Sequence, residues 1–104
     1  MKYMIVITTA GSRKTAQAIS EALVKKRLAA CVQTSRIQST YLWKGKVARE
    51  GEFLLLIKSR ASNFRKIEKE IMLLHDYDIP EIIQIPISDG SSSYLRWIGA
   101  STKR

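Results

Sequence analysis

Two stretches of this 104-residue chain are apolar almost throughout and lack the alternation that marks a strand with one wet face. They are Tyr-Met-Ile-Val-Ile-Thr-Thr at residues 3–9 and Phe-Leu-Leu-Leu-Ile at residues 53–57. Continuous runs of this kind are typical of strands that are buried on both faces. The sequence therefore predicts a sheet with two apolar faces, and both faces need a cover.

Composition indicates a single domain over residues 1–104 with one hydrophobic core. The chain carries 18 Lys and Arg against 9 Asp and Glu, a net charge of +9, which attracts anions and acidic partners and disfavours free metal cations. Cys31, the only cysteine, excludes an intrachain disulfide, and its apolar neighbours favour a buried thiol in a reducing compartment. The apolar N-terminal run is too short for a signal peptide, and no run approaches the ~20 residues of a membrane span. We expect a soluble, unprocessed cytoplasmic protein with no membrane partner.

Periodicity and turn residues predict an alternation of strands and helices. Ser12 is suited to cap a first helix, and Ser62 opens a second. Lys44-Gly45 marks a turn between two long strands, and Pro80 ends the second helical region near His75. The predicted strands are residues 3–9, 29–43, 46–59 and 81–87, and the predicted helices are residues 12–28, 62–75 and 94–100.

This order matches the ferredoxin-like βαββαβ plan, of the α+β class, with a long central hairpin and an added C-terminal helix. Right-handed crossovers give an antiparallel four-stranded sheet with both main helices on one face. The other face is then bare and apolar. The hairpin strands also exceed the usual 5 to 6 residues, so their ends should overhang the sheet. We therefore expect copies of the chain to associate in a closed ring that covers the bare faces.

The segment His75–Ile82 gathers the only histidine, a tyrosine and several carboxylates at a constrained corner between helix and strand. Pro80 biases Ile79 toward extended geometry, which fixes this corner. His75 has two interpretations: it caps the C-terminus of the helix, or it binds a metal ion. One His and one Cys cannot supply the three or four donors of a zinc or copper site within one chain, so a metal site would need neighbouring copies.

Five segments carry a resemblance that covers nearly the whole chain: Ala29-Ala30-Cys31-Val32, Tyr41-Leu42-Trp43-Lys44-Gly45-Lys46, Leu56-Ile57-Lys58-Ser59, His75-Asp76-Tyr77-Asp78-Ile79-Pro80-Glu81-Ile82 and Tyr94-Leu95-Arg96-Trp97. In order and spacing they resemble the successive signatures of the CutA divalent-cation tolerance family. The resemblance implies a ferredoxin-like protomer, a homotrimer, a cytoplasmic location and a role in tolerance or homeostasis of divalent metals such as copper. It implies a binding, signalling or scaffold protein and no established enzymatic reaction.

The resemblance also implies where ligands bind. Copper-binding members are credited with a cysteine and paired histidines at positions that here are Thr8 and Leu74-His75, so only His75 is left as a candidate metal ligand, for weakly bound Cu²⁺. No cofactor is required. The second candidate site is a pocket between protomers, lined by Tyr41, Trp43, Lys58, Tyr77 and Glu81. The same residues could instead form an ordinary interface in which Lys58 and Glu81 make an ion pair.

Two other classes of function are compatible with this fold plan. An RRM-like nucleic-acid binding module would need exposed aromatics and a basic Gly-Phe pattern on the third strand, which residues 52–57 lack. A small-anion sensor would suit the charge of +9. For enzymes, residues 11–15 lack the glycine spacing of a phosphate loop, and Cys31 in an apolar strand is poorly placed to ionise. No catalytic constellation stands out.

Overall fold

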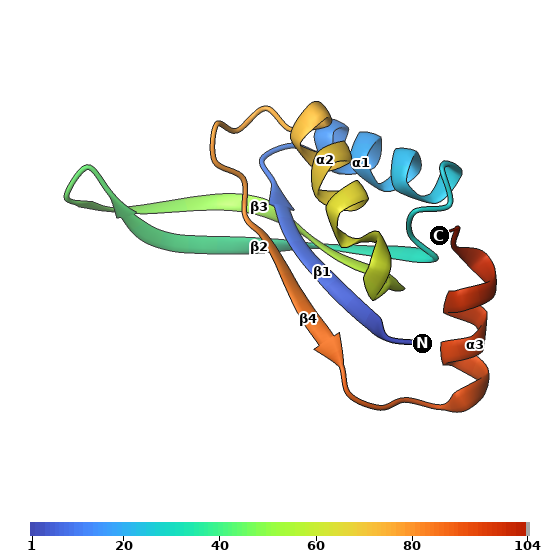
Figure 1. Cartoon of the computed structure of the whole chain (residues 1–104). Coiled ribbons are helices and arrows are strands. Elements are labelled where there is room, and N and C mark those ends of the chain that lie inside the picture. The colour runs from blue at the N-terminus through green and yellow to red at the C-terminus, as the bar shows by residue number, and fades with distance from the viewer. Residues whose placement is uncertain (104) are drawn as a thin grey trace.

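Strands and helices follow the chain in the predicted order (Figure 1). The computed structural model describes residues 1–103, so Arg104, which the predicted domain includes, lies outside the described residues. The elements are β1 Tyr3–Ala10, α1 Arg13–Lys25, β2 Cys31–Trp43, β3 Lys46–Arg60, the 3₁₀ helix η1 Ala61–Asn63, α2 Phe64–Leu74, β4 Ile82–Ile87 and α3 Ser92–Ser101.

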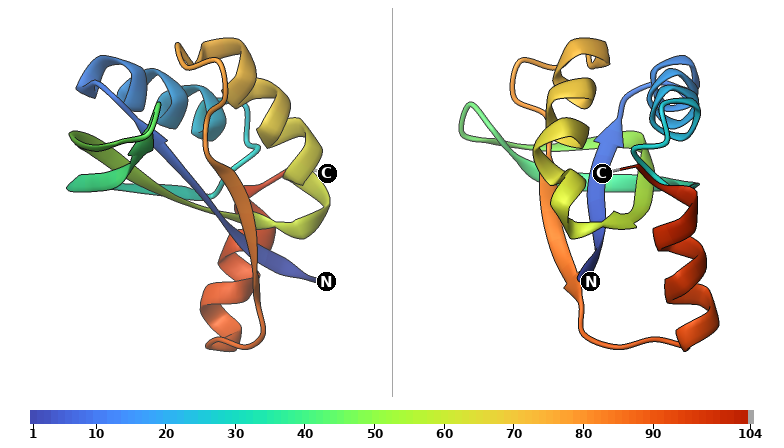
Figure 2. Two further views of the ribbon diagram at one scale, coloured as in Figure 1. Left: turned by 90° about the vertical axis from the view of Figure 1, so that its left-hand side faces the viewer. Right: turned by 45° about the vertical axis from the view of Figure 1, so that its right-hand side comes forward.

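The four strands form one antiparallel sheet in the order β2-β3-β1-β4. Helices α1 and α2 lie together on one face of this sheet, and α3 lies apart from them at the end where the N-terminus emerges (Figures 1 and 2). This arrangement confirms the predicted ferredoxin-like plan with its added C-terminal helix.

The hydrophobic core fills the space between the sheet and the two helices. On β1, Met4 and Val6 point into it, and the antiparallel register brings Ile57 and Leu55 of β3 to the same face. Helices α1 and α2 supply Ile19, Leu23, Ile67 and Ile71, all fully buried. Their spacing of four residues within each helix places each pair on one side of its helix.

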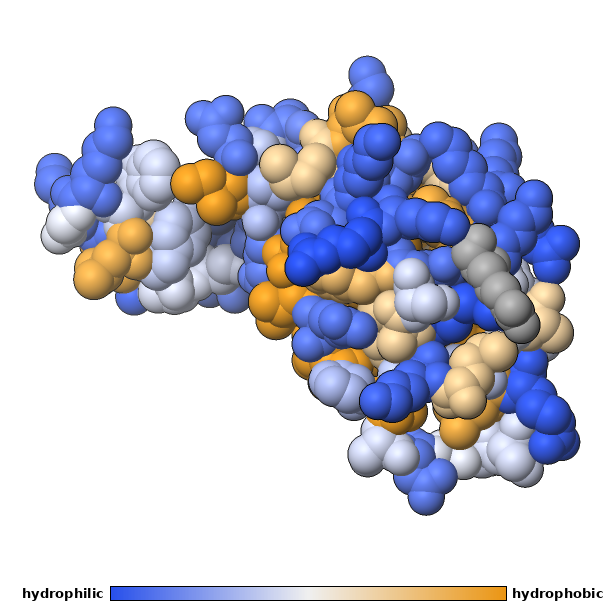
Figure 3. All heavy atoms as spheres, in the orientation of Figure 1, coloured by the Kyte–Doolittle hydropathy of each residue, from blue (hydrophilic) through white to orange (hydrophobic). Residues whose placement is uncertain are grey.

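The opposite face of the sheet, here called the open face, is also apolar. Ile5 and Ile7 of β1 alternate with the core residues and are only partly buried, and on β4 Ile83 and Ile85 are 49% and 42% exposed. Figure 3 shows apolar side chains gathered at the surface where β4 runs. The prediction of a second apolar face is therefore confirmed.

Beyond the end of β1, strands β2 and β3 continue as a two-stranded ribbon, here called the arm (residues 37–52). The last pair between β1 and β3 is Ala10 with Phe53, whereas β2 and β3 stay paired as far as Trp43 with Lys46. Lys44 and Gly45 both have positive φ, 51° and 79°, as the tight turns that suit the twist of a hairpin require. The arm projects away from the rest of the molecule (Figure 1), which confirms the predicted overhang.

Some local predictions hold and others need correction. Ser12 caps α1 as predicted, because its side chain accepts the N–H of Thr15 at 3.1 Å. Ser62 does not open α2: it lies within η1, and the α-helix begins at Phe64 after Asn63. The Asn63 side-chain amide donates to the carbonyl oxygens of Leu28 and Lys103, and these bonds anchor that short turn.

Cys31 and α3 also differ from expectation. Cys31 is half-buried instead of buried, since its pairing with Lys58 places it on the open face. Helix α3 begins at Ser92, two residues before its predicted start. Its C-terminal end is held by the buried guanidinium of Arg60, which donates to the carbonyl oxygens of Gly99 and Thr102 and to the Thr102 hydroxyl.

Candidate functional site

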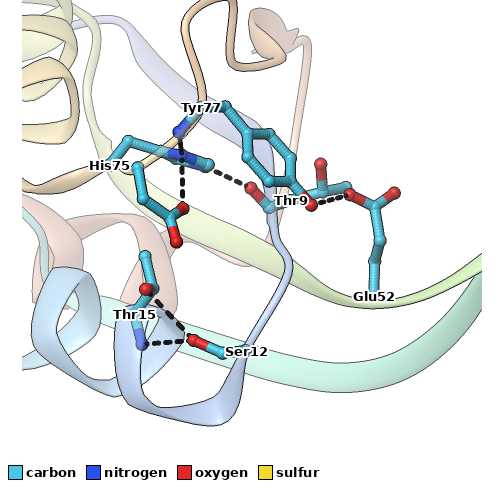
Figure 4. Close-up of polar contacts among 7 residues, drawn as sticks. Thr9, Ser12, Thr15, Glu52, His75 and Tyr77 are labelled. Carbon is cyan, nitrogen blue, oxygen red and sulfur yellow. Dashed lines mark hydrogen bonds and ion pairs between the residues drawn. The ribbon is translucent and has the colours of Figure 1, made fainter.

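His75 lies at the C-terminus of α2, and both nitrogens of its buried ring are engaged. Its Nε2–H donates to the carbonyl oxygen of Thr9 at 2.6 Å, and its Nδ1 accepts the backbone N–H of Tyr77 at 3.1 Å (Figure 4). A carbonyl can only accept and an amide N–H can only donate, so these contacts assign the neutral tautomer protonated on Nε2. The His75 backbone N–H also bonds to the Ile71 carbonyl at 2.8 Å. The geometry is that of a helix cap tied to β1.

The donors of one chain do not fit a metal centre. Asp76 Oδ1 lies 3.6 Å from His75 Nδ1, but that nitrogen already accepts the Tyr77 N–H. Thr8, the other position that the resemblance relates to a metal ligand, is fully buried with its hydroxyl unpartnered. Across residues 1–103, no group of three or more His, Cys, Asp or Glu side chains is arranged to hold a metal ion. A resident metal therefore has no prepared set of ligands within one subunit.

Tyr77 fastens the loop that follows α2 to the base of the arm. Its hydroxyl donates to Glu52 Oε2 at 2.9 Å, and its ring lies 4.6 Å from the His75 ring, centroid to centroid. Burial, together with the hydrogen bond to the Glu52 carboxylate, raises the pKa of the Tyr77 phenol well above its ordinary value. Gly11 makes room for this ring, since a Cβ there would lie 2.7 Å from the Tyr77 hydroxyl oxygen.

The loop and the arm enclose a pocket of about 680 Å³, here called the acidic pocket. Four of the five residues predicted for the ligand site line it: Tyr41, Trp43, Tyr77 and Glu81. Three further carboxylates, which the sequence interpretation missed, line it as well: Glu50, Glu52 and Asp78. The neighbouring Glu50 carboxylate is the main cause of a raised pKa at Tyr41. A signal for Glu50 and Glu52 was present, because alternate residues of one strand share a face.

Lys58, the fifth predicted residue, lies outside the acidic pocket of its own chain. Its Nζ donates to Gln33 Oε1 at 2.6 Å and stands 5.6 Å from the centroid of the Tyr94 ring, which stacks on Trp97. Within residues 1–103, Lys58 makes no ion pair with Glu81. We call Lys58, Gln33, Tyr94 and Trp97 the lysine cluster. Its Lys58 lies on the β3 segment that pairs with β1, whereas the acidic pocket lies at the arm.

A second cavity of similar volume lies near the N-terminus and includes Lys2, Arg60 and Ser62 in its lining. The guanidinium of Arg60 is committed to the end of α3, as described above. This cavity therefore belongs to the attachment of the C-terminal helix.

Comparison with known proteins places this fold and these motifs in one family. The family described as CutA1 divalent ion tolerance protein matches residues 4–101. The chain belongs to the CutA1 family. Its relatives include the divalent-cation tolerance protein CutA of Thermus thermophilus, 39% identical over 99 residues that cover 94% of this chain and 96% of that protein. Another is the chloroplastic CutA of Arabidopsis thaliana, 38% identical over 96% of this chain and 56% of that protein.

Solved CutA structures share the fold over the full chain. The periplasmic divalent cation tolerance protein CutA of Archaeoglobus fulgidus superposes with a TM-score of 0.94 at 34% identity, covering 97% of this chain and 99% of that one. CutA1 of Oryza sativa gives a TM-score of 0.96 at 33% identity, covering 100% and 96%. These names include periplasmic and chloroplastic proteins, so family membership does not fix a compartment. No helix within residues 1–103 is long and apolar enough to span a membrane.

Proposed function

We propose that the protein is a homotrimer of the cytoplasm that takes part in the tolerance or homeostasis of divalent metal ions such as copper. In this proposal it acts as a binding, signalling or scaffold protein and not as an enzyme. The names of its relatives support the role in divalent-cation tolerance. The half-buried free thiol of Cys31 suits a reducing compartment. The observation that carries the proposed assembly is the exposed apolar surface of β4 on the open face of the sheet.

The open face and the arm together favour a closed ring of copies. Ile83 and Ile85 lie on β4, an edge strand, and the arm exposes Trp43 at its far end. Exposed apolar side chains of this kind on a single chain are typical of an interface. Packing the open face of one subunit against the arm and sheet edge of the next would cover both, and a heterologous contact that closes on itself leaves no face bare.

The same contact would complete the ligand pocket predicted from the family. One subunit supplies Tyr41, Trp43, Tyr77 and Glu81. The next supplies Lys58, which lies too far along β3 to serve its own pocket. The acidic pocket and the lysine cluster are opposite in charge, so each is a suitable counterpart for the other.

A charge exchange tests this contact. Lys58→Glu and Glu81→Lys should each shift the protein toward smaller species in light scattering after size exclusion, because like charges then meet across the interface. The double variant should restore the trimer. Full assembly of both single variants, or no recovery in the double variant, would reject the contact, and a monomeric parent protein at micromolar concentration would reject the trimer itself.

Weak Cu²⁺ binding at His75 stays a prediction, and the local geometry explains why it should be weak. A metal ion at Nδ1 must replace the hydrogen bond from the Tyr77 N–H. Among residues 1–103, the exposed Asp76 carboxylate is the only acidic group within 4 Å of the ring nitrogens. Calorimetry with Cu²⁺ should detect a heat that His75→Ala removes. If both proteins give the same heat, His75 is not the ligand.

A further inference from the structure

The acidic pocket is negatively charged, although the molecule as a whole is positively charged. The chain carries a net charge of +9, yet four of its nine acidic residues line the pocket, and no Lys or Arg among residues 1–103 does so. The carboxylates come from two separate segments: Glu50 and Glu52 from β3, and Asp78 and Glu81 from the loop after α2. Since the two segments meet only in the folded chain, the concentration of negative charge is a property of the site and not of a local acidic run.

Glu52 is the strongest sign that this pocket suits a cation. Glu52 is only 9% exposed, and one of its carboxylate oxygens accepts a hydrogen bond from the Tyr77 hydroxyl. Buried carboxylates are normally paired with a positive charge, because burial removes their hydration. The ion pairs within residues 1–103 are Lys26 with Glu70 and Arg65 with Glu68, and neither involves Glu52.

The lining favours an organic cation over a metal ion. The pocket carboxylates do not form a group of three or more metal donors within residues 1–103. Tyr41, Trp43 and Tyr77 supply aromatic surface, which attracts ammonium and guanidinium groups through the ring face. Trp43 already shows this attraction, since Lys44 Nζ stands 5.9 Å from the centroid of its ring. A volume of about 680 Å³ lies within the usual range for small-molecule pockets.

We propose that the acidic pocket binds an organic cation with two or more ammonium or guanidinium groups, of the class of aliphatic diamines and polyamines. This deepens the ligand pocket of the proposed function and depends on that pocket, but not on a metal at His75. If Lys58 of a second copy enters the pocket, it brings one positive charge against four carboxylates. The remaining negative charge still calls for a ligand of more than one charge, and it would repel a small anion.

Calorimetric titration with 1,4-diaminobutane tests the proposal, with 1,4-butanediol as the uncharged analogue of the same length. The diamine should release a binding heat that falls as salt is added, and the diol should release none. Mg²⁺ at the same concentration separates a shaped site from a general attraction of cations to carboxylates. Equal binding of diamine and Mg²⁺, or no difference between diamine and diol, would overturn the proposal.

Matched variants locate the binding. Glu52→Gln keeps the size of the side chain and an oxygen for the Tyr77 hydroxyl, and it should weaken diamine binding about tenfold. Glu68→Gln removes one negative charge on α2, outside the pocket, and should leave the affinity unchanged. Equal effects of the two variants would show that only overall charge matters and would reject the site.

Light scattering on each titrated sample keeps this proposal distinct from the proposed assembly. Diamine binding by a monomeric protein would support the acidic pocket and reject the trimer. A trimer that gives no diamine heat would support the proposed assembly and reject diamine binding in the acidic pocket.

Discussion

The two faces of the sheet are built from the same kinds of residue and differ in what covers them. Under α1 and α2, Val6 and Ile57 are fully buried, whereas on the open face Ile83 and Ile85 keep nearly half of their surface exposed. Both faces would gain about 25 cal/mol for each Å² of apolar surface removed from water. The difference indicates that folding alone buries one face, whereas burial of the other face requires association.

The largest expected effect comes from placing a charge on the open face. Ile85→Glu should abolish the trimer, because burying an unpaired carboxylate in an apolar interface costs several kcal/mol. Light scattering at a fixed protein concentration measures the change. Leu73→Glu is the matched control, since Leu73 is 71% exposed on α2, away from the open face. If both variants assemble normally, the open face is not an interface.

A pair of truncations on neighbouring residues of β3 compares the two faces directly. Ile57→Ala should lower the free energy of unfolding by about 2 to 5 kcal/mol, the usual cost of a cavity in a packed core. Leu56→Ala, on the open face, should instead weaken assembly, measured by the protein concentration at which the complex dissociates. A variant Leu56→Ala that loses as much folding stability as Ile57→Ala in a dilute, dissociated sample would contradict the distinction between the faces.

Substitution of Gly11 tests the contact between Tyr77, in the loop after α2, and Glu52 at the base of the arm. Gly11→Ala puts a methyl group 2.7 Å from the Tyr77 hydroxyl, so the ring must move away from Glu52. We expect a loss of about 1 to 3 kcal/mol in urea denaturation. Gly51→Ala is the control, because a Cβ at Gly51 meets no atom within 4 Å and should change stability by less than about 1 kcal/mol. A harmless Gly11→Ala would show that Tyr77 is not held as described.

The Tyr77 phenol also predicts a dependence on alkaline pH. Its pKa is raised in the folded protein, so above about pH 10 the unfolded chain loses this proton while the folded chain keeps it. Below about pH 10 this proton is bound in both states and does not change the free energy of unfolding. As the pH rises further, the free energy of unfolding falls by at most about 1.4 kcal/mol per pH unit. Urea denaturation between about pH 9 and 11 should show that the free energy of unfolding falls more steeply with pH in the parent protein than in Tyr77→Phe. Parallel declines would contradict the raised pKa.

The smallest expected effect concerns Thr8, on the covered face. Its buried hydroxyl has no hydrogen-bond partner, so Thr8→Val replaces it with a methyl group of similar shape and should stabilise the protein by about 1 kcal/mol. Thr34→Val, at an exposed position of β2, is the control and should change stability by less than about 0.5 kcal/mol. Destabilisation by Thr8→Val would indicate that the hydroxyl has a partner after all.

The sequence was sufficient for the fold because its strongest signals are local. The apolar runs, the Lys44-Gly45 turn and the Ser12 cap each depend on neighbouring residues, and all three appear in the structure where they were expected. Ser62 was misplaced, because the turn before α2 is fixed by Asn63 contacts to segments far away in the chain.

The candidate site was harder to predict, because it depends on strand register. Family motifs singled out Tyr41, Trp43, Tyr77 and Glu81, which line one pocket. The contact between Glu52 and Tyr77 joins two separate segments, and neither segment indicates it alone. The separation of Lys58 from this pocket has the same origin. Lys58 lies six residues beyond Glu52 on β3, which separates the two by about 20 Å at the rise of about 3.3 Å per residue in a strand.

The arm has a consequence for how occupancy and assembly influence each other. A ribbon of two strands is only marginally stable in water, so the wall of the acidic pocket that the arm provides has little rigidity of its own. If a neighbouring subunit steadies the arm, it lowers the entropy that a bound molecule must give up, and by thermodynamic linkage that molecule tightens the ring to the same degree. A small solute could thus report its own abundance through the lifetime of the oligomer.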